Sequence, residues 1–259
     1  MTAASAPRVF ITGASSGIGA ALAAHYAARG AQLGLTARRA EILADVARRL
    51  PGEPVCYTAD VADAAAMAAA AHDFMARFGA PDIVIANAGI SVGTLTEHAE
   101  DIARLSRVLQ TNVVGLAATF QPFIAPMRAA GRGRLAGIAS VAGVRGIPGA
   151  GAYSASKAAA IAYLEALRVE LRPSGVKVVT VCPGYVATPM TAVNKYRMPF
   201  ILPADVAARR IARVIDAGRA AAVVPWQMAI VAGFMRLLPN AIYDRLFKRA
   251  GRKPRGLPL

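Results

Sequence analysis

Residues 8–19 read Arg-Val-Phe-Ile-Thr-Gly-Ala-Ser-Ser-Gly-Ile-Gly, and this stretch decides the fold. Its first five residues are a short apolar run typical of a buried β-strand. The glycine-rich turn leads directly into an alanine-rich segment, roughly residues 17–29, which we expect to be helical. Glycines at such a turn let the backbone approach a pyrophosphate, and the helix N-terminus adds free N–H groups. The stretch predicts a nucleotide-binding turn, with a purely structural glycine turn as the alternative.

Short apolar runs and longer helical segments alternate along the rest of the chain. We expect strands at residues 32–36, 55–58, 83–86, 134–139, 177–182 and 220–224. We expect helices at residues 40–50, 62–78, 101–118 with a second segment beyond Pro122, 153–171 and from Pro203 onward. Such alternation predicts βαβ units. The predicted fold class is α/β, a single Rossmann-type doubly wound parallel sheet with helices on both faces and a C-terminal helical extension.

The length of the chain fits one domain. Residues 1–225 are expected to form the dinucleotide-binding and catalytic part, and residues 226–259 an apolar and basic extension of the same domain.

Right-handed crossovers place the carboxyl ends of all strands along one edge, where ligands bind. Residues that follow strand ends are therefore expected to converge on one cleft: the glycine turn, Asn87, Ser140 and Pro183-Gly184.

Composition limits the class of protein further. The formal net charge is +15, a balance shared with nucleic-acid-binding proteins. The basic residues are scattered through helical segments, however, and no DNA- or RNA-binding motif accompanies them. We expect a solvated basic surface and no nucleic-acid partner.

Metal chemistry and disulfide bonds are not expected. The histidines have no metal-ligand spacing; they are His25, His72 and His98. Cys56 and Cys182 lie in strand-like apolar segments and are expected to be buried, reduced thiols. Residues 1–7 lack the basic and apolar regions of a secretory signal, so we expect a cytoplasmic protein.

Tyr153 and Lys157 are the clearest catalytic candidates. A separation of four residues places both on one face of a helix, one turn apart. A nearby ammonium favours phenolate, so the pKa of Tyr153 is expected to fall from about 10 toward working pH. Tyr153 is then a candidate general acid/base at a carbonyl or hydroxyl. The spacing is common, and a half-buried tyrosine beside a solvent-reaching lysine is the structural alternative.

Over about residues 7–225 the motifs follow the order and spacing of one known family. The chain resembles the short-chain dehydrogenases/reductases in its TGxxxGxG turn at residues 12–19, its Asn-Ala-Gly at 87–89 and its YxxxK at 153–157. It also has the family's helix asparagine at Asn112 and its serine at Ser140. The family's Pro-Gly turn matches Pro183-Gly184, with Thr188 following. Taken alone, Ser140 could be a turn residue and Asn112 a polar contact within a helix. The combination of these motifs is specific for the family.

The resemblance implies hydride transfer between a nicotinamide and a carbonyl carbon or its alcohol. Tyr153 would be the general acid/base, and Ser140 would polarise the carbonyl. Lys157 would lower the Tyr153 pKa and hold the nicotinamide ribose, and Asn112 would hold a water that relays protons. The cofactor-binding residues implied are Gly13, Ser15, Ser16, Gly17, Ile18, Gly19, Arg38, Arg39, Asp60, Val61, Asn87, Ala88, Gly89, Tyr153, Lys157, Pro183, Gly184, Val186 and Thr188. Asp60 could instead be a helix N-cap.

The residues after the second expected strand indicate which cofactor is used. Ala37 stands where NAD-dependent members of the family carry an acid for the ribose 2′-OH, and Arg38 and Arg39 follow it. Guanidinium groups bind a 2′-phosphate, which an acid would repel. We therefore predict NADP(H) and, with it, reduction as the direction. Two exposed arginines at a helix start are the alternative, and Ser16 stands where many NADP-dependent members carry a base.

The substrate is expected to be an apolar ketone, aldehyde or secondary alcohol, because the segments expected to form its pocket carry little charge. They are residues 141–152, Tyr185 and residues 190–202, the last being a substrate-covering loop in this family. The family's helices around Asn112 and Tyr153 commonly pack across subunit interfaces. A homodimer or homotetramer is therefore expected.

The C-terminal segment is apolar over residues 220–235, and residues 236–255 then carry seven Lys/Arg and one acid. The apolar run is shorter than the about 20 residues that span a bilayer. An interfacial helix at a membrane surface is one interpretation. A cover over the substrate pocket or a subunit interface is the favoured one. Two functional alternatives remain: a non-catalytic, cofactor-sensing regulator, and a membrane-associated dehydrogenase of lipid or steroid type.

Overall fold

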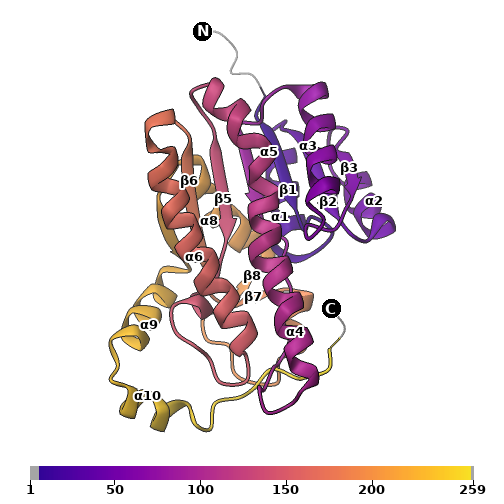
Figure 1. The fold of residues 1–259 in the computed structure, drawn as a ribbon. Coiled ribbons are helices and arrows are strands. Elements are labelled where there is room, and N and C mark those ends of the chain that lie inside the picture. The colour runs from indigo at the N-terminus through magenta and orange to yellow at the C-terminus, as the bar shows by residue number, and fades with distance from the viewer. Residues whose placement is uncertain (1–5, 258–259) are drawn as a thin grey trace.

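Seven short strands rich in valine, isoleucine and alanine build the centre of the computed structural model, which describes residues 6–257 (Figure 1). They are β1 Arg8–Thr12, β2 Gln32–Ala37, β3 Val55–Thr58, β4 Ile83–Ala86, β5 Arg134–Ile138, β6 Lys177–Pro183 and β9 Ala221–Val224. Every neighbouring pair is parallel, in the order β3-β2-β1-β4-β5-β6-β9. The predicted α/β class is confirmed.

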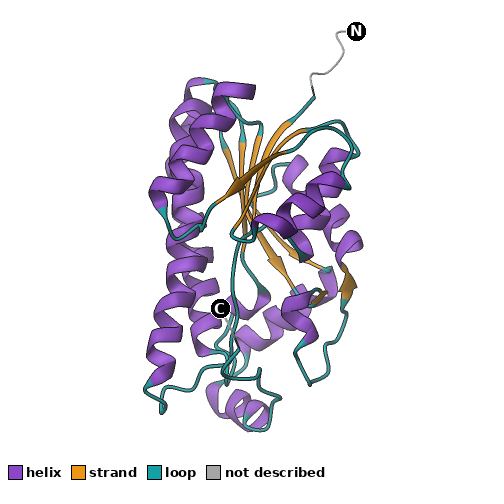
Figure 2. Cartoon of the chain, turned by 90° about the vertical axis from the view of Figure 1, so that its right-hand side faces the viewer, coloured by secondary structure: helices purple, strands orange, loops and turns teal. Residues whose placement is uncertain are grey.

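Helices cover both faces of the sheet, as Figure 2 shows. One face packs against α1 Gly17–Ala27, α2 Ala40–Arg48 and α8 Ala204–Asp216, and the other against α3 Ala64–Phe78, α5 Gly115–Ala129 and α6 Gly151–Leu171. Side chains alternate along each strand, so Ile11 faces the first layer and Phe10 the second. The Phe10 ring lies 5.5 Å from that of Phe74 on α3 and 5.0 Å from that of Phe123 on α5. Burial on both faces explains why the strands are apolar throughout.

The longest helix continues further than its sequence predicts. It comprises α4 Glu100–Leu109, a π-helical turn Gln110–Val114 and α5, and it passes through Pro122 and Pro126 without a break. Prolines inside a helix cost about 3 kcal/mol, but fully buried Phe120 and Phe123 anchor this segment against the sheet. By length and composition the continuous helix could cross a membrane, yet its packing is that of an ordinary core helix.

Several short elements surround the carboxyl edge of the sheet. A small parallel pair, β7 Val186–Ala187 and β8 Leu202–Pro203, encloses the short helix α7 Pro189–Ala192, and a 3₁₀ turn occurs at Val141–Gly143. A second 3₁₀ turn, Arg172–Ser174, lies at the opposite edge, before β6. None of these was predicted. Cys182 is buried as expected, but the prediction for Cys56 is wrong: it is exposed because β3 is an edge strand.

The C-terminal extension is helical, as predicted, in α9 Trp226–Leu237 and α10 Asn240–Phe247. After α10 the chain turns back without regular structure and runs across the lower end of the molecule to α4 (Figure 1). Arg145 ties the two helices to the loop after β5: its guanidinium donates to the carbonyls of Met235 and Leu238 and lies 3.9 Å from the centre of the Tyr243 ring.

Candidate active site

Strand order reverses between β1 and β4, and a compact hydrogen-bond cluster joins the carboxyl ends of these two strands. The Thr12 hydroxyl accepts hydrogen bonds from the backbone N–H groups of Asn87 (3.1 Å) and Ala88 (3.2 Å). The Asn87 amide in turn donates to the carbonyls of Thr12 (3.0 Å) and Gly13 (3.3 Å). The sequence elements around residues 12 and 87 therefore hold each other in place.

The glycines of the turn are required by backbone shape and by close packing. Gly13 and Gly17 have φ values of +67° and +58°, which other residues rarely adopt. Gly19 is different: a Cβ atom there would lie 2.3 Å from the Gly13 carbonyl oxygen. Its role is to let α1 approach the turn, and Gly19 does not line the cavity described next.

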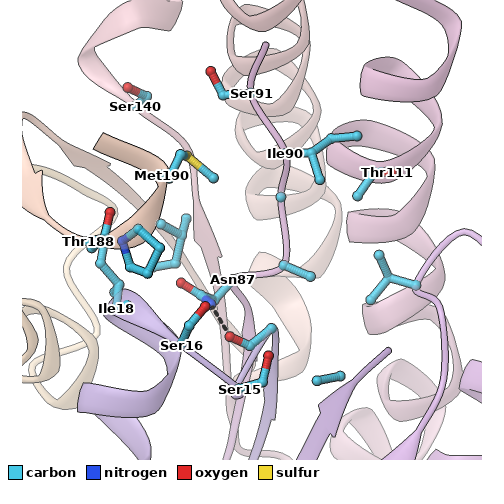
Figure 3. A pocket seen from close by; sticks show the side chains of 18 of the residues that line it. Ser15, Ser16, Ile18, Asn87, Ile90, Ser91, Thr111, Ser140, Thr188 and Met190 are labelled. Carbon is cyan, nitrogen blue, oxygen red and sulfur yellow. Dashed lines mark hydrogen bonds between the residues drawn. The ribbon is translucent and has the colours of Figure 1, made fainter. Parts of the chain in front are cut away.

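A cavity of about 580 Å³ lies along the carboxyl edge of the sheet. Figure 3 shows Ser15 and Ser16 at one end of it and Ser91 and Ser140 at the other. All other residues predicted to bind cofactor line it, as do three of the four predicted catalytic residues: Ser140, Tyr153 and Lys157. Its size and its side-chain-free glycine turn fit a dinucleotide.

Sequence reasoning missed about a third of the lining residues. They include Thr36, Ala59, Ile90, Ser91 and Thr111. Most of these residues lie next to a predicted residue at a strand end. Extending each motif by one or two positions would therefore have included them. Of the three segments expected to surround the substrate, only Met190 and its neighbour Thr191 reach this cavity.

Tyr153 and Lys157 lie on α6 and both face the cavity. The Lys157 ammonium donates to the Ile138 carbonyl (2.8 Å) and lies 5.7 Å from the centre of the Tyr153 ring. Burial lowers the pKa of Lys157 to about 8. Burial also raises the pKa of Tyr153, and the neighbouring Ser140 side chain counters only part of that rise. The predicted fall of the Tyr153 pKa is therefore not found, because burial raises this pKa and the Lys157 ammonium is directed at a backbone carbonyl.

Ser140 follows β5 and points toward the same end of the cavity as Ser91 (Figure 3). Its hydroxyl oxygen accepts a hydrogen bond from the Ala142 N–H (3.1 Å), and its proton is directed only weakly at the Pro183 carbonyl (3.5 Å). The hydroxyl proton is therefore available to a ligand oxygen.

Asn112 does not line the cavity. It lies in the π-helical turn, a feature often found at functional sites. Its side chain receives a hydrogen bond from the Ile90 N–H (2.8 Å) and donates to the Ile90 carbonyl (3.0 Å) and the Ser156 hydroxyl (2.9 Å). These bonds use both amide protons and one lone pair of Oδ1 in joining three segments, which leaves one Oδ1 lone pair and the backbone for the predicted water relay.

The two arginines after β2 have different surroundings. Arg38 lies 3.8 Å from the Asp60 carboxylate, which is held closer by Arg107 (2.7 Å). Burial of Asp60 opposes its ionisation, but hydrogen bonds from the Ala62 N–H and Arg107 keep its pKa below the ordinary value. Arg39 contacts only hydroxyls, those of Ser15 (3.3 Å) and Ser16 (3.4 Å), and forms no ion pair within residues 6–257.

The structure excludes the alternative role of Asp60 as the N-cap of a helix. Asp63, not Asp60, caps α3, since its carboxylate accepts hydrogen bonds from the N–H groups of Ala65 and Ala66. Asp60 instead lines the cavity beside Val61. No cluster of three or more metal-ligating side chains occurs in the described part of the chain.

A model of the short chain dehydrogenase family matches residues 7–198. The chain belongs to this family. It is 37% identical over 244 residues to an uncharacterized oxidoreductase of Myxococcus xanthus, covering 92% of this chain and 95% of the relative. It is 39% identical over 188 residues to 11-beta-hydroxysteroid dehydrogenase 1A of Arabidopsis thaliana, covering 71% of this chain and 53% of that protein.

Solved structures agree with this assignment. A short-chain dehydrogenase from Streptomyces avermitilis superimposes with a TM-score of 0.78 at 26% identity, covering 94% of this chain and 96% of the other. A 3-ketoacyl-(acyl-carrier-protein) reductase from Brucella melitensis, complexed with NADH, gives 0.76 at 25% identity, covering 84% and 96%. The chain is thus an oxidoreductase of a family that uses nicotinamide cofactors on small molecules.

The depressed pKa of Lys157 makes a prediction about stability. Between about pH 8 and 10 the unfolded chain binds a proton at Lys157 that the folded protein has lost, so this group makes folding more favourable as pH rises. Relative to Lys157→Met, the unmodified protein should gain up to about 1.4 kcal/mol of unfolding free energy per pH unit. Urea unfolding of both proteins at several pH values measures this; parallel curves would show that Lys157 titrates normally.

Proposed function

We propose that the protein is an NADP(H)-dependent reductase of apolar ketones or aldehydes. The observation that supports this most strongly is the position of Ser140 at the end of the cavity opposite the glycine turn (Figure 3), with Tyr153 and Lys157 beside it. The bound cofactor would supply the hydride. The polar groups at the catalytic end match what a carbonyl oxygen needs as it gains negative charge.

The residues have separate roles in this proposal. Tyr153 keeps its proton at neutral pH because burial raises its pKa, so it is a proton donor to the carbonyl oxygen. The Ser140 hydroxyl donates a hydrogen bond to the same oxygen. Lys157, still mostly protonated at pH 7, would hold the nicotinamide ribose and return a proton to Tyr153. Asn112 fixes the loop after β4 and α6, which carries both Tyr153 and Lys157.

The preference for NADP(H) rests on Arg39. Among residues 6–257 its guanidinium has only neutral hydroxyl partners, at the mouth of the glycine turn where the adenosine ribose of a dinucleotide would lie. Arg38 is the second cation, and Ala37 leaves no carboxylate to repel a 2′-phosphate. A charged phosphate would give Arg39 the partner that it lacks.

Tyr153→Phe tests the proton donor. The variant should lose about 10²- to 10⁴-fold in kcat, because the proton donor is removed while the cavity keeps its shape. NADPH affinity should change little. Tyr163→Phe, half-buried on the same helix but away from the cavity, is the matched control. Steady-state kinetics and NADPH binding would be measured on both, and unchanged turnover in Tyr153→Phe would refute the assignment.

Arg39→Ala tests the cofactor preference. Loss of a charge-assisted contact with the 2′-phosphate should lower kcat/KM for NADPH by about 10- to 100-fold. The value for NADH should stay within about twofold. The control is Arg49→Ala, an exposed arginine outside the cavity. Equal losses with both cofactors would mean that Arg39 acts on the turn and not on the phosphate.

The exposed face of the C-terminal helices supports a further proposal, peripheral binding of this otherwise cytoplasmic protein to anionic membranes. On α9 the exposed fractions are 65% for Trp226, 64% for Ile230, 61% for Phe234 and 84% for Leu237. These residues are spaced three or four apart and so share one side of the helix. Arg245, Lys248 and Arg249 are exposed nearby in the chain. Apolar and basic side chains together suit an interfacial helix.

Vesicle binding can be followed through Trp226, the only tryptophan in the chain. Vesicles containing phosphatidylserine should shift its emission to shorter wavelength and sediment the protein, whereas neutral vesicles should do so weakly. Replacing Phe234 and Leu237 with serine should weaken binding at least about tenfold. Ile42→Ser, at an exposed apolar site on α2, should have no effect. Equal binding by both variants would exclude α9 as the contact.

The predicted homodimer or homotetramer stays a prediction. Ile102, Val114 and Val169 are exposed on the α4–α5 and α6 helices, where the family's subunit contacts would lie. Light scattering in solution would measure the assembly directly.

A further inference from the structure

The last described residues, 251–257, return from α10 to the substrate end of the cavity. They pass three segments in turn. Gly251 lies against Tyr196, with room for no side chain: a Cβ atom would be 2.4 Å from that of Tyr196. The Arg252 side chain packs on Gly149, and Leu257 packs into the small cluster around Val92.

Backbone contacts join this segment to the loop after β4. The Gly93 N–H donates to the Pro254 carbonyl (3.0 Å), and a Cβ atom at position 93 would lie 2.2 Å from the Lys253 carbonyl oxygen. The adjoining residues Ile90 and Ser91 line the cavity. The C-terminal segment therefore contacts the loop that contributes Ile90 and Ser91 to the cavity wall.

The opposite wall is held by Lys253. Its side chain is 8% exposed, and its ammonium donates to the carbonyl of Met190 (2.8 Å), a residue that lines the cavity. One residue thus contacts both walls, the loop at Gly93 through its backbone and the loop at Met190 through its side chain. Among residues 6–257 this ammonium has one hydrogen-bond partner, and burying it is costly unless that bond is kept.

Arg255 fixes the far end of the segment on α4. Its guanidinium lies 2.7 Å from the carboxylate of Asp101, which is 2% exposed, and 2.9 Å from that of Glu100. Asp101 also accepts a hydrogen bond from the Leu95 N–H (2.8 Å) and is paired with Arg104. The ion pairs therefore connect the end of the chain to the same loop that lines the cavity.

We propose that residues 251–257 form a strap across the substrate end of the cavity and limit the size of the substrates that it admits. The size limit rests on the proposed function, because it concerns apolar carbonyl compounds. Closure, meaning that the strap stays bound to the loop at Gly93, does not depend on that function. The strap joins Met190, which lines the cavity, to Gly93 in the loop that carries Ile90 and Ser91. In this proposal a large substrate has to pass the strap to reach Ser140 and Tyr153.

Closure is tested by hydrogen exchange at the Gly93 amide, which requires no activity. The amide should be protected in the full-length protein. In Arg255→Ala, and in a chain ending at Ala250, it should exchange at least about tenfold faster. Arg249→Ala is the matched control, since it removes one charge from an exposed neighbouring position. Equally fast exchange in the full-length and shortened proteins would overturn the strap.

The size limit is tested by calorimetric binding of cyclohexanone and a four-ring ketone to the NADP⁺-loaded protein, which cannot reduce them. Shortening the chain at Ala250 should raise the affinity for the large ketone relative to the small one by about tenfold. Arg249→Ala should not change this ratio. An unchanged ratio in the shortened protein would overturn the size limit. If neither ketone bound while Gly93 stayed protected, the proposed substrate class would fail and closure of the strap would stand.

Discussion

The site depends on the hydrogen-bond cluster between Thr12 and Asn87. It lies where the order of strands reverses, so that the helices following β1 and β4 run along opposite faces of the sheet. The cluster sets the glycine turn against β4, and β4 in turn positions the loop that Asn112 holds. Through Asn112 and Ser156 the constraint reaches α6, which carries the tyrosine and the lysine. One junction thus relates the cofactor end of the cavity to the catalytic end.

Much of this arrangement could be predicted from the sequence, because it follows from local rules. Apolar runs predicted the strands of the main sheet, and parallel topology brought the residues after their carboxyl ends together. Long-range packing explains what was missed. An apolar run does not show whether a strand lies at the sheet edge, hence the error at Cys56. The helix continues through Pro122 because aromatic residues that are neighbours only in the fold anchor it.

Side-chain directions, and contacts between residues far apart in the chain, could not be predicted from the sequence either. The spacing of Tyr153 and Lys157 placed them on one helix face but did not show that the ammonium is directed at the Ile138 carbonyl. The ion pair of Arg255 with Asp101 joins positions 154 apart in the chain, and no periodic pattern indicates such a contact. The same is true of the C-terminal segment as a whole, whose charge and hydrophobicity suggested several functions and whose path only the structure supplies.

We propose that this cavity carries out NADPH-dependent carbonyl reduction. The most direct measurement is the loss of NADPH absorbance on mixing the purified protein with a broad panel of apolar ketones and aldehydes, repeated with NADH. The account predicts turnover of at least some of these compounds, with higher kcat/KM for NADPH than for NADH. Tight NADPH binding with no turnover across the panel would contradict it and would favour a cofactor-sensing protein.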